Sequence, residues 1–578
     1  MTLRTLPRLA LLSCLAGAAH AAAPAAGSYD VLISGATVYD GSGQKGYIGD
    51  VGITGDRIVY VGPKAPLPAK ERINGHGKAV APGFVNMLAH PEESLLVDGR
   101  ALSDLRQGVT LEVLGEDSMG PLTPKMKALA LQREGDVKYD IDWNTLGEYL
   151  HGLERRGITP NVASYVGAGT VRINVLGEVD VQPTPEQLQQ MRALVRQAME
   201  EGAVGVTTAL IYAPNTYAKT PELMALASEA ARCGGIYSAH MRSEGDRLIE
   251  AVQETIDISN ASGAPAEIFH LKVAGQRNWP KIDPLIQTIE GARAKGVHIS
   301  ADMYVYTAGA TGLDAAMPPW VQDGGLEAWI QRLKDPAIRA RVIAEMREPK
   351  SSWENLFEAA GPKGMLLLAF KNPNLKPLTG KTLAEVAQAR GVSPEDAAID
   401  LVIEDGSRVG VAYFLMSEDN VRRQVALPWV SFDSDEAAPA PEGVFLKSNS
   451  HPRAYGNFVR VLAKYVREEH ALTLEQAIHK LAALPAQTLS LKDRGQLKAG
   501  YFADVVVFDP RTVQDHATYD KPAQLATGVE DVWINGVRAL RAGEATSAPS
   551  GRIVRGRAWK EAPGGGCRAN AADWSWGS

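Results

Sequence analysis

The sequence predicts an α/β protein: a (β/α)8 TIM-type barrel with a small β-sandwich formed from both chain ends. The chain has 578 residues, which is longer than a chain that folds around a single ordinary hydrophobic core. Short apolar strands alternate with amphipathic helical stretches over residues 81–490, a pattern typical of a parallel barrel with insertions. Strand-rich segments lie on either side, at residues 22–80 and at residues 491–578, which also include a C-terminal tail.

The two terminal segments consist of short strands joined by tight turns. Gly55 and Asp56 separate two apolar runs, and Asn535 and Gly536 do the same near the C-terminus. Both dipeptides indicate two-residue hairpins. Two strand-rich pieces at opposite ends of one chain most simply pair with each other, which predicts a single sandwich beside the barrel.

Residues 1–21 have the layout of a secretory signal peptide. Arg4 and Arg8 precede a short apolar stretch, and residues 19–21 have the A-x-A form of a cleavage site. We expect an exported protein, periplasmic or extracellular, with no transmembrane segment because the apolar stretch is too short. Removing two arginines and no acid changes the formal charge from −7 to −9. A lipid anchor at Cys14 is the alternative.

Composition excludes several classes of protein. With 60 basic and 67 acidic residues, nothing favours nucleic acid as a partner. Three cysteines exclude both a disulfide scaffold and a cysteine-rich zinc module. Cys233 and Cys567 belong to distant segments, so we expect two separate thiols. The sequence does not indicate an oligomeric state.

Two histidines end predicted barrel strands. His240 ends GGIYSAH and His270 ends AEIFH, at the strand ends where barrel active sites are built. Imidazole is a preferred zinc ligand, so the pair favours a shared metal over two separate structural histidines. Lys272 follows on the same strand face and could hold a substrate carboxylate or carbonyl group, or form a salt bridge at the rim.

Carboxylates follow two further apolar runs. Glu116 and Asp117 come after VTLEVLG, and either could complete the ligand set of a catalytic zinc, which leaves one position for water. Asp433 and Asp435 lie in PWVSFDSDEA. A carboxylate there could take a proton from water and return it to a leaving amine, although both aspartates could instead cap loops.

Polar groups for a substrate are also present. The tyrosines are Tyr212, Tyr304 and Tyr306. Arg453, in SHPRAYGNF, is suited to bidentate binding of a carboxylate, and the alternative is an ordinary surface arginine.

These residues resemble those of the amidohydrolase superfamily, specifically the N-acyl-D-amino-acid deacylase (D-aminoacylase) family. The resemblance covers nearly the whole mature chain and includes YDVLISGATVYDGSG, SAHMRSEGDRLIEAVQE, HPRAYGNFVRVLAKYVRE and GQLKAGYFADVVVFDP. It implies a metal-dependent barrel with a β-sandwich assembled from both termini.

The resemblance also implies roles for individual residues. His240 and His270 match the metal histidines, and Asp435 matches the catalytic acid/base. Glu116 stands about where related deacylases present a cysteine ligand, so it is the expected third ligand, with Asp117 as the alternative. A carboxylate keeps the anionic charge of a thiolate, and zinc remains suitable. The positions that match contacts to substrate are Lys272, Tyr212, Tyr304 or Tyr306, and Arg453.

The first predicted barrel strand departs from the family pattern. The family reads P-G-F-I-D-x-H-x-H, whereas this chain has Asn86 at the aspartate and Leu88 at the first histidine. Leucine cannot bind a metal, so we expect one tightly held Zn²⁺ instead of two. His90 is then expected to be a supporting or core histidine.

The expected function is hydrolysis of N-acyl-D-amino acids to a carboxylate and a free D-amino acid. Zinc would activate water and polarise the amide, with Asp435 as general acid/base and Tyr212 or Tyr304 donating to the oxyanion. Arg453 and Lys272 would hold the substrate carboxylate. The alternatives are a cyclic-amide hydrolase or dipeptidase of the same superfamily, and a non-catalytic binding protein that has lost the first-strand histidine pair.

Overall fold

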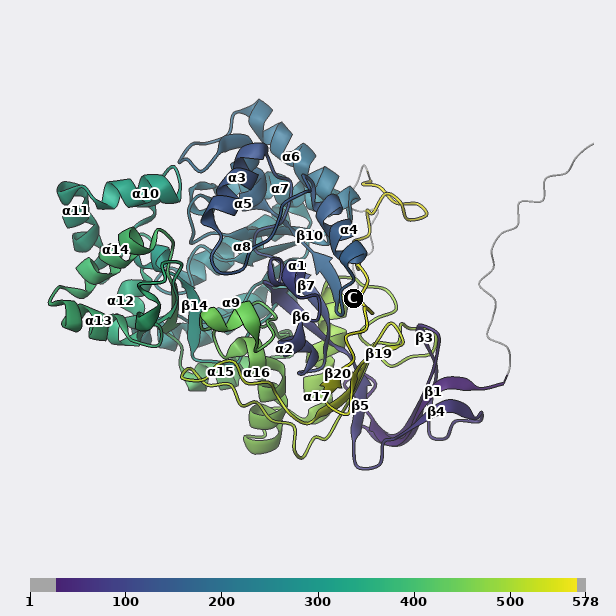
Figure 1. Cartoon of the computed structure of the whole chain (residues 1–578). Coiled ribbons are helices and arrows are strands. Elements are labelled where there is room, and N and C mark those ends of the chain that lie inside the picture. The colour runs from purple at the N-terminus through teal and green to yellow at the C-terminus, as the bar shows by residue number, and fades with distance from the viewer. Residues whose placement is uncertain (1–26, 569–578) are drawn as a thin grey trace, which may run out of the picture.

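Parallel strands form the centre of the molecule in a computed structural model, which describes residues 27–568 (Figure 1). The predicted signal peptide and Cys14 lie outside the described residues. The central strands are β6 (Phe84–Ala89), β7 (Val109–Leu114), β8 (Asn161–Ser164), β9 (Val166–Gly167), β10 (Gly205–Ala209), β11 (Ile236–His240), β12 (Ala266–Ile268) and β13 (Ile299–Ala301).

These strands close into a ring. Parallel pairing runs from β6 to β8 and from β9 to β13, and β8 and β9 are one stretch interrupted at Tyr165. Residues 430–435 supply the last strand: Val430 bridges Ala301 of β13, and the carbonyl of Phe432 accepts from the N–H of Met87 in β6. The predicted eight-stranded barrel is therefore confirmed.

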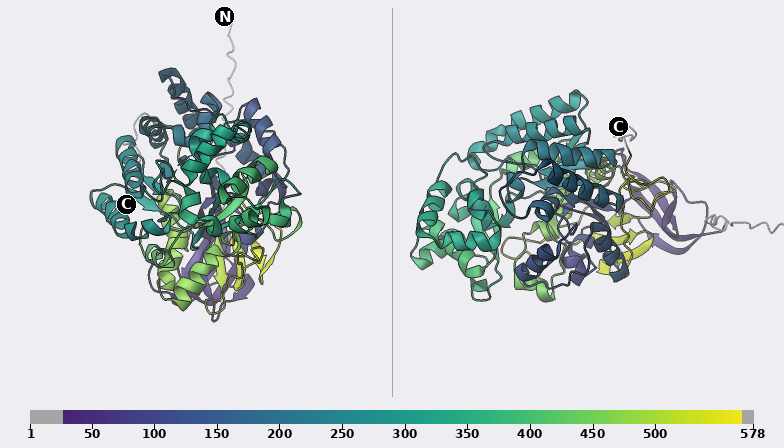
Figure 2. Two further views of the ribbon diagram at one scale, coloured as in Figure 1. Left: turned by 90° about the vertical axis from the view of Figure 1, so that its left-hand side faces the viewer. Right: turned by 90° about the horizontal axis from the view of Figure 1, so that it is seen from above.

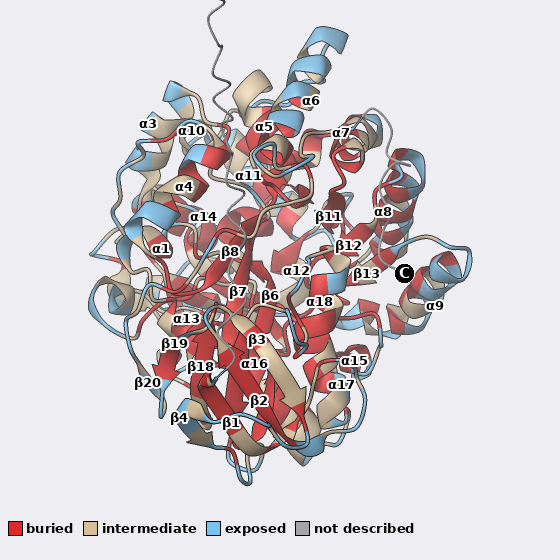
Figure 3. Cartoon of the chain, turned by 90° about the vertical axis from the view of Figure 1, so that its right-hand side faces the viewer, coloured by how far each residue is buried: buried red, intermediate tan, exposed pale blue. Residues whose placement is uncertain are grey.

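Helices surround the ring. They are α1 (Ser94–Val97), α2 (Leu102–Leu105), α3 (Pro124–Arg133), α4 (Leu146–Arg156), α5 (Ala168–Leu176), α6 (Pro185–Glu200), α7 (Thr220–Arg232), α8 (Leu248–Ser262), α9 (Ile282–Ala294), α15 (Glu418–Val425), α16 (Arg453–Arg460), α17 (Leu474–Ile478) and α18 (Leu484–Thr488). Figure 3 shows the barrel strands as buried, with exposed residues on outer helices such as α6 and α9.

Helix α6 illustrates how the sequence builds this layer. Thr184 accepts a hydrogen bond from the N–H of Gln187, whose side chain bonds back to the N–H of Thr184, a capping box that starts the helix. Met191, Val195 and Met199 are buried at helical spacing. That spacing places one apolar stripe of the helix against the barrel.

An insertion between β13 and the last barrel strand forms a separate layer of helices around a small antiparallel sheet, β14–β16–β15. Its elements are β14 (Ala308–Gly312), α10 (Leu326–Leu333), α11 (Pro336–Met346), α12 (Leu356–Ala360), β15 (Met365–Ala369), α13 (Leu383–Arg390), α14 (Pro394–Asp405) and β16 (Gly410–Phe414). The insertion lies at one end of the molecule, opposite the sheet made from the chain ends (Figure 2).

The two chain ends share one nine-stranded sheet, because β17 pairs with β5 and so joins C-terminal strands to N-terminal strands. Its strands are β1 (Tyr29–Val38), β2 (Tyr47–Thr54), β3 (Arg57–Gly62), β4 (Ala69–Asn74), β5 (Ala79–Pro82), β17 (Val505–Phe508), β18 (Val529–Ile534), β19 (Val537–Arg541) and β20 (Glu544–Ala545).

Both predicted hairpins of this sheet are confirmed. Thr54 pairs with Arg57 across the first turn, and Ile534 pairs with Val537 across the second. Gly536 has φ +79°, and a Cβ there would lie 1.9 Å from the carbonyl oxygen of Gly55. The two turns therefore touch, and only glycine fits the second one.

The expectation of two separate thiols is wrong, because Cys233 and Cys567 form a disulfide. The segment before Cys567 runs back along the barrel: the N–H of Gly551 donates to Ile158 O, and that of Gly556 to Gly202 O. This path carries Cys567 to the end of α7, so a sequence separation of 334 residues becomes a Cα–Cα distance of 4.2 Å.

Among the described residues, no helix has both the length and the apolar character needed to cross a membrane.

Candidate metal centre

Four predicted site residues meet at the carboxyl ends of the barrel strands. His240 is the last residue of β11, while Glu116 and His270 each lie two residues beyond β7 and β12. Asp435 ends the last barrel strand. Parallel strands in a closed ring bring their carboxyl ends to one rim, so residues far apart in sequence become neighbours.

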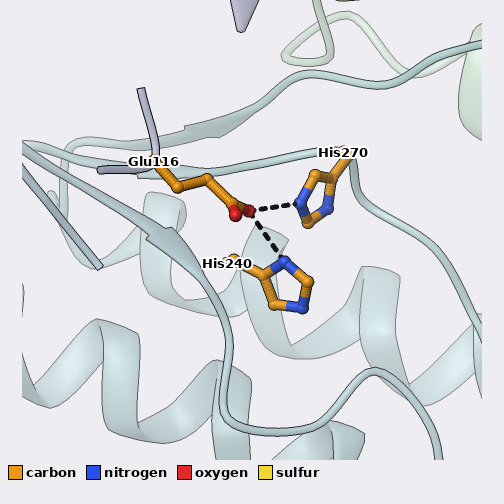
Figure 4. A group of neighbouring side chains, drawn as sticks. All are labelled: Glu116, His240 and His270. Carbon is orange, nitrogen blue, oxygen red and sulfur yellow. Dashed lines mark hydrogen bonds and ion pairs between the residues drawn. The ribbon is translucent and has the colours of Figure 1, made fainter. Parts of the chain in front are cut away.

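Glu116 lies between the two histidines (Figure 4). Its Oε1 is 2.8 Å from His240 Nδ1 and 3.0 Å from His270 Nε2. One ligand atom from each residue lies within 4.8 Å of the others. Asp117 is not part of this cluster, so the structure favours Glu116 over Asp117 as the carboxylate of the site.

The donor set fits a divalent metal such as zinc. Two imidazole nitrogens and one carboxylate oxygen make up the three protein ligands typical of a catalytic zinc, whose fourth position is taken by water. Burial alone would raise the pKa of Glu116, but the charge of His240 and the hydrogen bonds to both histidines hold it well below its usual range. The carboxylate is therefore ionised, as a ligand must be.

Glu244 supports this cluster, and the sequence analysis missed it. Its Oε1 lies 3.0 Å from His270 Nδ1 and accepts a hydrogen bond from Lys272 Nζ at 2.7 Å. His270 Nδ1 therefore lies between Glu244 Oε1 and Lys272 Nζ, which is 2.6 Å away, so Nε2 is the ring nitrogen that faces Glu116. Burial would raise the pKa of Glu244, yet Lys272 and both histidines lower it to about 2. Glu244 lies in the irregular loop after β11, where residue spacing gives no periodic signal.

Asp435 lies at the cavity with both oxygens paired. Its Oδ1 is 3.1 Å from His90 Nε2, and its Oδ2 is 2.9 Å from Arg453 Nη1. These partners keep the pKa of Asp435 well below its usual range despite burial. Asp433 is fully buried in the barrel beside Asp302, so it is Asp435 that can reach a substrate.

Arg453 is buried, so the surface alternative for this residue is wrong. Its side chain is 2% exposed, and its guanidinium lies 4.4 Å from the ring centre of Tyr304. Tyr304 lines the cavity, whereas Tyr306 packs edge-on against His451. The structure thus favours Tyr304 over Tyr306 as the substrate-facing tyrosine.

Tyr212 packs against His240, whereas Tyr304 packs against His270. Its ring is edge-on to His240 at a centroid distance of 5.2 Å. Burial raises the pKa of Tyr212 and Tyr304 well above the usual value, so both phenols keep their protons at neutral pH and can donate hydrogen bonds.

A cavity of ≈ 1050 Å³ is lined by Glu116, both histidines and Asp435. Part of its wall comes from the insertion, including Trp329, Leu356 and Phe370. The predicted site residues on its surface are Glu116, Tyr212, His240, His270, Lys272, Tyr304, Asp435 and Arg453.

A metal-ligating rim on a closed barrel, with a sheet built from both chain ends, defines the amidohydrolase class. The chain belongs to the amidohydrolase family, whose model matches residues 71–539. Within that class it belongs to the D-aminoacylase group. D-aminoacylase of Alcaligenes xylosoxydans xylosoxydans is 32% identical over 531 residues, which cover 91% of this chain and 97% of the relative. N-acyl-D-glutamate deacylase of the same organism is 33% identical over 531 residues, 91% of this chain and 96% of the relative.

Solved structures of D-aminoacylases and related deacylases are also similar to this chain. A D-aminoacylase studied for its binuclear metal centre, with one-metal activation and second-metal attenuation, has a TM-score of 0.77 and 30% identity, covering 91% of this chain and 100% of that chain. N-acyl-D-glutamate deacylase of Bordetella bronchiseptica, complexed with zinc and a phosphonate mimic of the tetrahedral intermediate, has a TM-score of 0.76 and 29% identity, with the same coverage. A D-hydantoinase, at 13% identity and a TM-score of 0.52 over 92% of this chain and all of its own, shares the fold alone.

Proposed function

We propose that this protein is a metal-dependent hydrolase that cleaves N-acyl-D-amino acids to a carboxylate and a free D-amino acid. The observation that carries the proposal is the meeting of Glu116, His240 and His270 with Asp435 and Arg453 in one cavity. Relatives named for the deacylation of N-acyl-D-amino acids match over 90% or more of this chain.

Glu116, His240 and His270 would hold one zinc ion. When bound, that ion would supply a Lewis acid for the amide carbonyl and lower the pKa of a nearby water. A single ion is consistent with the first strand, since Leu88 has no ligand atom. Glu244 and Lys272 contact Nδ1 of His270 and so orient its Nε2 toward the site.

Asp435 carries the proton transfers. Its carboxylate takes a proton from the attacking water as oxygen adds to the amide carbon, and then returns that proton to the departing amine nitrogen. Tyr212 and Tyr304 are protonated and line the cavity, so either can donate to the carbonyl oxygen as negative charge develops.

Arg453 and Lys272 provide positive charge for the substrate carboxylate. Without substrate, Arg453 pairs with Asp435 and Lys272 pairs with Glu244. A substrate carboxylate would join these pairs, and Arg453 would then connect substrate position to the catalytic carboxylate.

The test is turnover of purified protein on N-acetyl-D- and N-acetyl-L-amino acids, with hydantoins and dipeptides as the competing substrate classes. We expect activity on N-acetyl-D-amino acids and about one zinc per chain. Asp435→Asn should keep its zinc and lose about 10²–10⁴-fold in kcat. Turnover by Asp435→Asn at the wild-type rate would contradict the role of Asp435, and hydrolysis of hydantoins alone would contradict the substrate class.

We also propose that the protein is exported. The Cys233–Cys567 disulfide supports this proposal, since disulfides persist in oxidising compartments. Cell fractionation should place the protein in the periplasm or medium, with a mature N-terminus after Ala21. Incorporation of labelled palmitate would instead indicate the anchor at Cys14.

A further inference from the structure

The end of β6 is joined to the loop that carries Asp435. The N–H of Asp435 donates to Leu88 O at 3.0 Å, and the N–H of His90 donates to Glu436 O at 2.9 Å. Asp435 has φ +48°, in the left-handed region that residues with a side chain rarely adopt. Such a conformation persists only where the surroundings hold it, and here β6 does so.

Asn86 adds a buried connection to the same loop. Its Oδ1 accepts from the N–H of Ser434 at 2.8 Å, and its Nδ2 contacts Ser434 Oγ at 2.8 Å. Nδ2 also donates to Asp104 Oδ2 at 2.9 Å and Glu112 Oε2 at 3.0 Å. The amide therefore ties the loop before Asp435 to two carboxyl groups, because it offers both an acceptor oxygen and a donor nitrogen.

His90 contacts the carboxylate itself. His90 Nε2 lies 3.1 Å from Asp435 Oδ1, while Arg453 Nη1 occupies the other oxygen at 2.9 Å. Leu88, two residues earlier on the strand, is fully buried in the core and offers no ligand atom. Over residues 27–568, His90 is not part of the group that could hold a metal.

We infer that His90 is a positioning residue for Asp435 and not a metal ligand. The inference rests on the proposed function. His90 donates a hydrogen bond to Oδ1 of Asp435, so Arg453 forms its ion pair with Oδ2 alone. Without His90, the carboxylate can turn to form a bidentate pair with Arg453, since guanidinium and carboxylate prefer two parallel hydrogen bonds. Both carboxylate oxygens of Asp435 would then be bound to Arg453, and neither would be free to accept the proton of the attacking water.

The experiment compares His90→Ala, His90→Gln and a matched control, His298→Ala, which removes an exposed histidine far along the chain. Zinc content, kcat and KM are measured for each, with thermal unfolding to verify folding. We expect His90→Ala to keep the zinc of the wild type, to lose about 10–100-fold in kcat, and to change KM by less than about 3-fold. His90→Gln should recover part of kcat because its amide can donate to Oδ1.

Loss of zinc from His90→Ala would overturn the inference by making His90 a ligand, and wild-type kcat in both variants would overturn it as well. Wild-type protein inactive on every N-acyl amino acid would refute the proposed function alone. The contact is then tested by NMR of ¹⁵N-histidine-labelled protein. The imidazole resonance of His90 is identified by its absence from the spectrum of His90→Gln. This resonance should shift in Asp435→Asn and stay in place in His298→Ala. An unchanged His90 resonance in Asp435→Asn would overturn the inference.

Discussion

Glu116 completes, with the two histidines, the group that could hold a metal ion. It lies between them within hydrogen-bond distance of both, and Asp117, the next residue, does not. The choice between these neighbours could not be made from the sequence, because adjacent residues beyond a strand end face different directions. Only the backbone path after β7 settles which carboxylate reaches the histidines.

Replacement of Glu116 tests this assignment. We expect Glu116→Ala to fall well below one zinc per chain and to lose activity, because two imidazoles alone hold the ion poorly. Glu116→Cys should retain zinc, since a thiolate keeps the anionic charge. Asp117→Asn is the matched control and should resemble the wild type in metal analysis; zinc loss there would reverse the assignment.

Arg453 forms an ion pair with Asp435, and we propose that it also binds the substrate carboxylate. We expect Arg453→Ala to raise KM for N-acyl-D-amino acids about 10–100-fold, since a hydrogen-bonded charge pair contributes about 1.5–3 kcal/mol. Steady-state kinetics on the corresponding N-acyl-D-amino acid amides provide the control. These substrates lack the carboxylate, so the variant should raise their KM far less. An equal rise for both substrate classes would contradict carboxylate binding by Arg453.

At the level of elements, strand β12 alternates between an apolar outer face and a polar inner face. In β12, Ala266 and Ile268 pack in the core beneath the helices, whereas Glu267 lies beside Ser238 of β11 and Ser300 of β13. Ser300 donates to Glu267, and burial raises the pKa of Glu267 to about 8. The sequence predicted β12 as a barrel strand but did not single out this carboxyl, since burial on both faces hides the alternation.

Glu267 predicts a pH dependence of stability. Between about pH 4.5 and pH 8 the folded protein keeps a proton that the unfolded chain has lost, so stability falls as pH rises across this window. Glu267→Gln removes this contribution, and its stability relative to the wild type should rise by a few kcal/mol from pH 5 to pH 8.5. Apparent melting temperatures of both proteins across that range measure the effect. Parallel pH profiles would show that Glu267 is ionised in the fold.

At the scale of the whole molecule, the C-terminal segment fastens the chain end to the barrel. It passes Ile158 and Gly202, which precede β8 and β10, and reaches the disulfide beside α7. This path crosses the amino-terminal ends of the strands, opposite the metal centre. Stability and catalysis are therefore expected to respond separately to loss of this connection.

Cys567→Ser tests that separation. We expect a loss of about 2–4 kcal/mol in stability and faster proteolysis within residues 546–568, because the segment is no longer held covalently. The values of kcat and KM at 25 °C should match the wild type. Thiol titration of the unfolded wild type without reductant should detect neither Cys233 nor Cys567. A reactive pair of thiols in protein from the oxidising compartment would contradict the disulfide.

From the sequence alone we could predict the barrel, the sheet shared by the chain ends and the strand ends that carry His240, His270 and Asp435. These follow from hydrophobic periodicity and from motifs only a few residues long. The three-dimensional structure was needed to bring Glu116, and not Asp117, between the two histidines and to bring Tyr304, and not Tyr306, to the cavity. It was also needed to place Glu244 beside His270 and to join Cys233 to Cys567. Each of these depends on the direction of a side chain or on the path of a distant segment. Closure of the barrel sets both, and no local pattern in the chain records them.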